Sequence, residues 1–250
     1  MRKIILAFAV IQIALFSFVT NSFAKDSVTI GMRLEPAPGL DPTAGAAAAI
    51  SQVTWYNIFE GLTRISEKGV VGPMLASSWK VSNDGLTYTF KLLKGVKFHD
   101  GSDFTSDDVK FSFDRAAGEE SKNKNKKMYR AIDSIQTPDK HTVVIKLKKR
   151  SALFLFKLAQ STGAIVDAKS AENNGTNPIG TGPYKFVKWT KGDSVEMTLF
   201  DGHRNASKIK IKNAKFRFIN DANAQVNALM TGELDYMPNL SAPEMFSKFE

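Results

Sequence analysis

The sequence predicts an α/β fold, a mixed sheet with helices that carries an inserted β-rich subdomain. Predicted strands and helices mix irregularly along the chain, and no repeat of fixed period appears. Asp-Gly at residues 84–85 lies between two alternating segments and indicates a β-hairpin, because glycine accepts the positive φ that such turns require. Apolar residues make up 43% of the 250 and charged residues 24%, which is typical of globular proteins and excludes a disordered or fibrous chain.

Strands are expected where apolar and polar residues alternate over short stretches bounded by turn residues. Gly95 and Gly192 mark two further turns between such stretches. Three prolines exclude a helix from residues 35–42 and favour an extended backbone, because proline lacks the N–H that a helix needs. The predicted strands are residues 28–33, 78–81, 86–92, 96–98, 141–147, 184–189, 194–200, 215–219 and 234–237.

The best-defined helix begins after Thr105. Its side-chain oxygen can accept a free backbone N–H, and Asp107 and Asp108 suit the positive end of a helix. Gly118 is expected to end this helix. Further helices are predicted at residues 44–58, with Gly61 just beyond, at 154–159, and at 222–230, with Gly232 as the C-cap. The large aromatic residues expected in the core are Trp55, Trp79, Phe90 and Phe113.

Residues 1–24 have the pattern of a cleaved secretory signal. Two basic residues precede an apolar run at residues 4–19, and residues 22–24 place small side chains where a signal peptidase reads them. The run is shorter than the ~20 residues that a membrane-spanning helix needs. We therefore expect cleavage after Ala24 and a periplasmic or secreted protein. The chain has no cysteine, which excludes a lipid anchor, a disulfide framework and a thiolate metal site.

No catalytic site, metal site or cofactor is expected. The three histidines, His99, His141 and His203, stand apart from one another, and neither an HExxH nor a GxSxG motif occurs. Residues 180–183 (GTGP) resemble a phosphate loop only superficially, because a strand rather than a helix is predicted to follow. Binding is therefore favoured over catalysis. A secreted hydrolase that uses His99 and a neighbouring acid is the alternative, although no nucleophile supports it.

The charge pattern argues against a nucleic-acid partner. The formal net charge is +9, but the basic residues are spread along the chain. The one dense run, residues 122–127, has no interleaved aromatic residues and is better explained as a solvated loop. Export from the cytoplasm also argues against a nucleic-acid partner. We expect a monomer.

Eight short motifs, in this order, resemble one protein family: LDP at 40–42, FEGL at 59–62, PMLASSW at 73–79, DGLTYTF at 84–90, GVKFHDG at 95–101, TSDDVKFSF at 105–113, GTGPY at 180–184 and ALMTGELD at 228–235. Each motif alone is weak, but eight in the right order are very specific. The series is similar to the extracytoplasmic solute-binding proteins of peptide, nickel and opine ABC importers, known as family 5.

The resemblance implies a two-lobed receptor that closes on a small solute, here expected to be a peptide, and delivers it to an inner-membrane permease and ATPase. After the signal at 1–24, it implies a first segment of lobe I at 25–55. An inserted subdomain at 56–170 and a continuation of lobe I at 171–250 would follow. The second lobe would be missing, so the chain is expected to be an N-terminal part of such a receptor. A truncated remnant that binds nothing is the alternative.

The resemblance also implies residues that contact the solute. The segment after the first strand offers an extended edge to which a peptide could add as a strand, and in the family it runs beside the ligand. A tyrosine after the basic loop could pack on a ligand while its hydroxyl bonds a polar group. Small hydroxyl residues follow the short helix at 154–159. Glu35 could instead be a plain surface acid. The implied site residues are Leu34, Glu35, Ala37, Tyr129, Ser161 and Thr162.

Overall fold

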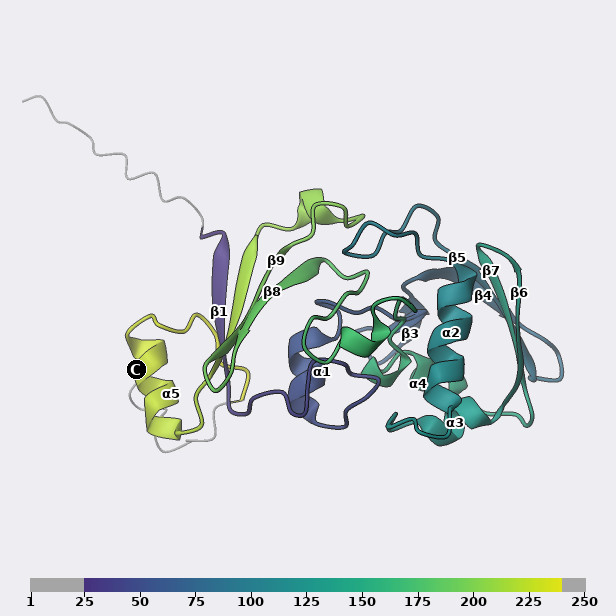
Figure 1. Cartoon of the computed structure of the whole chain (residues 1–250), viewed down its shortest axis with the longest axis horizontal. Coiled ribbons are helices and arrows are strands. Elements are labelled where there is room, and N and C mark those ends of the chain that lie inside the picture. The colour runs from purple at the N-terminus through teal and green to yellow at the C-terminus, as the bar shows by residue number, and fades with distance from the viewer. Residues whose placement is uncertain (1–24, 240–250) are drawn as a thin grey trace, which may run out of the picture.

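The first of two four-stranded sheets is mixed, as predicted. The computed structural model describes residues 25–239, so the predicted signal at 1–24 lies outside the described residues. This sheet has the order β1 (Ser27–Met32), β10 (Asn213–Phe218), β9 (Ser194–Leu199) and β8 (Tyr184–Thr190). β1 and β10 run parallel, whereas the other neighbours are antiparallel. Figure 1 shows this sheet at one end of the long axis and the second sheet at the other, with α1 (Ala48–Thr54) between them.

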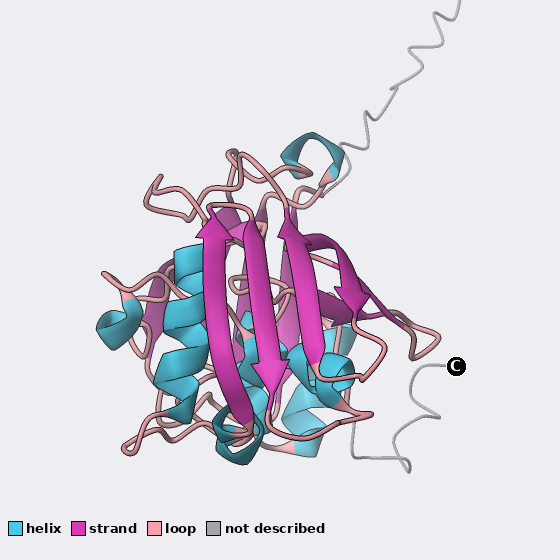
Figure 2. Cartoon of the chain, turned by 90° about the vertical axis from the view of Figure 1, so that its right-hand side faces the viewer, coloured by secondary structure: helices cyan, strands magenta, loops and turns pink. Residues whose placement is uncertain are grey.

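The second sheet is antiparallel throughout and corresponds to the predicted β-rich part. Its order is β4 (Ala76–Val81), β5 (Thr87–Leu92), β7 (Thr142–Leu147) and β6 (Ile132–Asp139). Figure 2 looks onto this sheet, with helices behind it. A short two-stranded pair, β2 (Thr63–Ile65) and β3 (Val71–Pro73), completes the strands. The predicted α/β class is thus confirmed.

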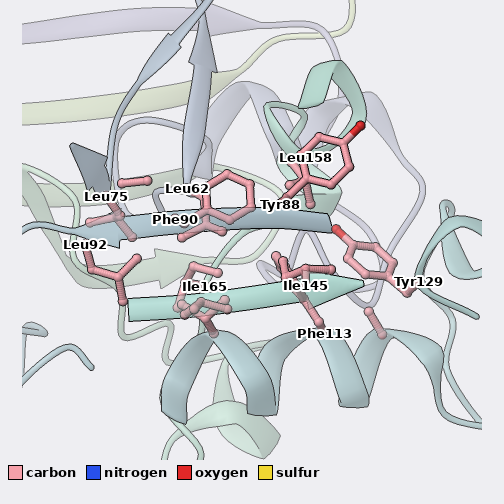
Figure 3. Packing of buried hydrophobic residues seen from close by; sticks show 14 of the residues in the cluster. Leu62, Leu75, Tyr88, Phe90, Leu92, Phe113, Tyr129, Ile145, Leu158 and Ile165 are labelled. Carbon is pink, nitrogen blue, oxygen red and sulfur yellow. The ribbon is translucent and has the colours of Figure 1, made fainter. Parts of the chain in front are cut away.

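Each sheet packs against its own helix. Helix α2 (Ser106–Ala117) buries Val109, Phe113 and Ala116 against the apolar faces of β5 and β7. Figure 3 shows the centre of this first core, where aromatic and branched side chains interdigitate. Helix α1 buries Ala49 and Val53 against the mixed sheet in a second core. The remaining helical elements are α3 (Lys126–Arg130), α4 (Phe154–Leu158), η1 (Ser161–Gly163), η2 (Ala171–Asn173), η3 (Ala206–Lys208) and α5 (Ala222–Met230).

Local sequence chemistry predicts several element ends correctly. Thr105 is the N-cap of α2 and forms a capping box with Asp108, and Gly118 is the C-cap, so both predicted ends of this helix are confirmed. Gly85 has a φ of +68° in the turn between β4 and β5, as the Asp-Gly pair predicts. Phe90 and Phe113 are fully buried, and Trp55 and Trp79 pack half-buried against the two cores.

The helix predicted at 44–58 is wrong at both ends. Helix α1 covers only Ala48–Thr54. Tyr56 has a φ of 65°, and its amide donates to the Phe59 carbonyl at 3.0 Å, so the chain forms a compact loop after α1. Alanine and aromatic residues fit a longer helix by propensity, but the contacts of Trp55 and Phe59 with the second core favour the loop.

Further stretches depart from prediction, since β2, β3 and α3 were not among the predicted elements. Residues 234–237 do not form a strand, because only Tyr236 bridges β1, at Ile30. Residues 96–98 contribute a single bridge between Lys97 and Asp103. Strand β6 is not among the predicted strands, and its two register shifts against β7 explain why, since bulges break the two-residue period that identifies a strand. None of the helices within residues 25–239 has the length and apolar character needed to cross a membrane.

Candidate functional site

Two hollows meet over the first turn of α1. One has a volume of about 620 Å³ and the other about 790 Å³. Ala48 and Gln52, one turn apart on the exposed side of α1, line both of them. We call the combined depression the α1 groove. Of the six implied site residues, Leu34, Glu35 and Ala37 line the smaller hollow, and Ser161 and Thr162 line the larger one.

The smaller hollow is bordered by the proline-containing segment after β1. Leu34 is 61% exposed and Ala37 is exposed, so both are open to solvent beside α1. The Glu35 carboxylate accepts hydrogen bonds from the Trp189 indole at 2.7 Å and from the Gly192 amide at 3.0 Å. Glu35 is therefore neither a plain surface acid nor an unpaired one. It fixes the segment against the turn between β8 and β9.

A second set of contacts fixes the chain between this segment and α1. The Arg115 guanidinium, on α2, donates to the Asp41 carboxylate at 2.9 Å and to the Thr43 hydroxyl at 2.6 Å. Asp41 is almost fully buried and also accepts from the Thr43 amide at 2.8 Å. A hydrogen bond between two charged groups, here a guanidinium and a carboxylate, is strong and directional. The LDP motif thus holds the entry to α1 against the second helix.

The larger hollow is bordered by η1 and by the loop before α3. The Ser161 hydroxyl lies 2.7 Å from the Ser51 hydroxyl on α1. The Thr162 hydroxyl accepts from Asn125 Nδ2 at 2.7 Å, and the same Nδ2 donates to Gln160 Oε1 at 2.9 Å. These side chains come from three separate segments. They form a polar wall that small solutes can hydrogen-bond.

Tyr129 does not belong to this wall. Its ring lies in the core, which contradicts the expectation that the ring packs on a ligand. It is 1% exposed and packs against Phe113, with 5.1 Å between the ring centroids (Figure 3). Its hydroxyl donates to the Thr162 carbonyl at 3.0 Å. Burial raises the pKa of this hydroxyl, so it remains a neutral donor. Tyr129 therefore supports Thr162 from the core, because a large aromatic side chain finds more apolar contact there.

His99 has a structural environment rather than a catalytic one. Its Nε2 lies 2.9 Å from the Gly182 carbonyl, and its Nδ1 accepts from the Gly180 amide at 3.3 Å. Burial lowers the pKa of His99 to about 4, so the ring is neutral near pH 7. Both ring nitrogens are occupied by the backbone. The ring thus holds the GTGP loop, and the hydrolase alternative has no base available at this position.

The GTGP loop itself lies against the FEGL motif. A Cβ atom at Gly180 would lie 2.0 Å from the Ile58 carbonyl oxygen, so only glycine permits this approach. The Thr181 hydroxyl donates to Glu60 at 3.0 Å, and Arg204 binds both oxygens of the same carboxylate. Burial raises the pKa of Glu60, but the hydrogen bonds and charge of Arg204, together with the neighbouring His203, outweigh it and leave the pKa below its usual value. Strand β8 follows this loop, as predicted, so it is a structural turn and not a phosphate loop.

A third hollow, of about 840 Å³, surrounds the Glu60–Arg204 pair. Arg64, Glu67 and Lys68 also line it, but none of the implied site residues does. Among the residues that the structure describes, no group of three or more histidine, cysteine or acidic side chains is placed to hold a metal ion.

Sequence reasoning missed the residues that join the two hollows. Ala48 and Gln52 lie four residues apart, and this spacing places them on one face of a helix. The available signal in the sequence was that both side chains are uncharged. The helix predicted at 44–58 is longer than α1, so the prediction did not show that these two residues lie near the open start of the helix. Asn125 and Gln160 were missed because their contact depends on two loops that are distant in sequence.

Comparison with known proteins places these features in a family. A family model described as "Bacterial extracellular solute-binding proteins, family 5 Middle" matches residues 70–250. A curated relative, the glutathione-binding protein GsiB of Pectobacterium atrosepticum, is 34% identical over 218 residues, which is 85% of this chain and 42% of GsiB.

Solved structures agree with this match. AgaA from A. tumefaciens R10, in complex with agropinic acid, is 32% identical with a TM-score of 0.82, over 89% of this chain and 45% of AgaA. The oligopeptide-binding protein AppA of Bacillus subtilis, in complex with a nonapeptide, is 27% identical with a TM-score of 0.79, over 89% and 45%. The chain spans less than half of the length of these relatives.

Proposed function

Because this chain belongs to the bacterial extracellular solute-binding proteins of family 5, we propose that it captures a small solute in the α1 groove for an ABC importer. The importer would consist of an inner-membrane permease and an ATPase that receive the solute from the binding protein. The protein would act as a binder and not as an enzyme. This agrees with the occupied nitrogens of His99 and with relatives whose names describe binding.

The observation that carries this proposal is the convergence of distant segments at the groove. Residues 34–37 follow the first strand, whereas residues 161–162 follow the fourth helix, yet both border hollows that share Ala48 and Gln52. Each border is fixed by side-chain hydrogen bonds rather than left loose. A preformed depression with a few placed polar groups is the usual form of a small-molecule site.

We propose a peptide or a peptide-like acid as the solute. The relatives support this class, since GsiB is named for glutathione, AppA was solved with a nonapeptide and AgaA with agropinic acid. In this chain the extended segment at Leu34 and Ala37 is exposed next to the groove, and it offers backbone groups to an extended ligand. The prolines at 36 and 38 limit that pairing to alternate positions, because they have no N–H.

The same proposal gives the domain organisation and the location. Residues 25–55 and 171–250 would form lobe I, and residues 56–170 its inserted subdomain. The opposing lobe would come from sequence that the matched part of the relatives does not cover, and closure of the two lobes would bury the solute. Cleavage after Ala24 would release a monomer into the periplasm.

The test is calorimetric titration of the full-length mature protein with glutathione, trialanine, the AppA-type nonapeptide and agropinic acid. We expect one or more of these to bind and to raise the melting temperature, because a ligand at a hundredfold excess over its Kd stabilises the folded state by about 2.7 kcal/mol. Absence of heat and of any melting shift across all four would overturn the assignment of a peptide-like solute.

A further inference from the structure

The larger hollow of the α1 groove is bordered by cations and by no acid. Lys124, from the loop before α3, and Lys157, from the last turn of α4, both line it. Neither forms an ion pair within residues 25–239, although eleven nitrogen–oxygen contacts of that kind occur elsewhere in this part of the chain. No aspartate or glutamate lines the same hollow. Its electrostatic potential is therefore positive.

The polar groups beside these lysines are mainly hydrogen-bond donors. The hydroxyls of Ser51 and Ser161 share one hydrogen bond, which leaves one O–H of the pair available. Gln160 accepts from Asn125 through Oε1. The NH₂ group of Gln160 has no partner among the described residues and remains available as a donor. Two cations and at least two donors at one end suit a ligand group that accepts hydrogen bonds and carries negative charge.

The other end of the groove adds one acid, which lines the smaller hollow and does not line the hollow that holds the two lysines. Glu35 is the one carboxylate that lines either hollow within the described residues, and it already accepts from Trp189 and Gly192. Arg33, which lines the smaller hollow, is exposed and forms no ion pair within the described part of the chain. Across both hollows, three cations without an ion pair within the described residues therefore face a single carboxylate, and the larger hollow contains none, so the α1 groove carries a net positive charge.

We propose that the α1 groove selects solutes that carry a carboxylate, and that Lys124 and Lys157 receive this group at the Ser161 end. This inference rests on the proposed function and adds the charge of the solute and its orientation. A lysine ammonium on a flexible stem can follow the carboxylate of ligands that differ in length. Complementary charge also steers association and disfavours analogues whose carboxylate is blocked, because those leave the lysines without a partner.

The test uses matched ligand pairs in which the carboxylate is either free or blocked. The full-length mature protein is titrated with glutathione and its diester, and with trialanine and trialanine amide. The same titrations are repeated on the double variant Lys124→Gln/Lys157→Gln. Lys127→Gln is the control, because Lys127 belongs to the same basic run but does not line the groove.

We expect the acid of at least one pair to bind ten or more times tighter than its ester or amide. The double variant should lose this difference, whereas the control keeps it. If the ester and the amide bind as tightly as the acids, or if the double variant keeps the preference, the carboxylate inference is overturned and the proposed function stands. If the unaltered protein binds none of these four ligands and neither the nonapeptide nor agropinic acid, the inference and the assignment of a peptide-like solute both fall.

Discussion

The Glu35 carboxylate binds the Trp189 indole at 2.7 Å, which connects the segment after β1 to the turn at the far end of β8. The two residues are 154 positions apart in sequence. A residue that the family resemblance implied as a ligand contact therefore has a defined structural partner. Its carboxylate orients Leu34 and Ala37 at the edge of the α1 groove, because its Oε1 accepts from both Trp189 and Gly192.

Replacing Glu35 by alanine should destabilise the fold. The change removes two hydrogen bonds to a charged acceptor, and because Glu35 is half-buried we expect a loss of about 1–2 kcal/mol in the free energy of unfolding. Glu35→Gln keeps one acceptor oxygen and should lose less. Urea unfolding followed by tryptophan fluorescence measures both. The control is Glu120→Ala, since Glu120 is exposed and makes no side-chain hydrogen bond within residues 25–239. Equal stability of Glu35→Ala and the control would contradict the role of this contact.

The Glu60 carboxylate should contribute to stability through Arg204 and Thr181. Glu60→Gln removes the charge from a site that is 2% exposed and leaves the Arg204 guanidinium, which is 29% exposed, without its counter-charge. Breaking a fully buried pair costs about 3–5 kcal/mol, and because Arg204 is partly solvated we expect about 2 kcal/mol. Urea unfolding tests this. Glu67→Gln, an exposed acid at the same hollow, should leave stability unchanged. A loss of the same size in both variants would mean that the pair has no special role.

His99 should make stability depend on pH in a defined window. Burial lowers the pKa of His99 from 6.5 to about 4, so between these values the unfolded chain binds a proton that the folded chain does not. The contribution of His99 to the free energy of unfolding is therefore fully present above about pH 6.5. It is lost as the pH drops towards 4, by an amount on the order of 3 kcal/mol.

The measurement for His99 is the free energy of unfolding from pH 7.5 to pH 4, for the unaltered protein and for His99→Gln. Glutamine can still donate to the Gly182 carbonyl but does not titrate. The slope between pH 6.5 and 4 should be shallower in the variant. Parallel curves for the two proteins would show that His99 does not titrate differently on folding.

Local chemistry made part of the fold predictable. The ends of α2 follow from a capping box and a terminal glycine, and the β4–β5 turn follows from Asp-Gly, because each feature involves only a few neighbouring residues. Strand β6 and the true length of α1 could not be predicted in this way. Their form depends on bulges against β7 and on the burial of Trp55 and Phe59 against distant strands.

The groove was predictable only in part. Five of the six residues implied by family resemblance border it, but Tyr129 lies in the core. An aromatic residue next to a basic loop has the same pattern whether its ring is buried or exposed, so the sequence alone could not distinguish these positions. The roles of Gln160 and Asn125 arise from a contact between loops 35 residues apart, which no local pattern encodes.

The most direct test of the account is solute binding by Ala48→Trp in the full-length mature protein. Ala48 is exposed and lines both hollows, so an indole there should fill the junction without entering the core. Ala224→Trp, at an exposed site on α5, is the matched control. We predict that Ala48→Trp weakens binding of the identified solute at least tenfold, with an unchanged melting temperature in the absence of solute, and that the control binds normally. Unchanged affinity in Ala48→Trp would place the solute elsewhere and contradict the account.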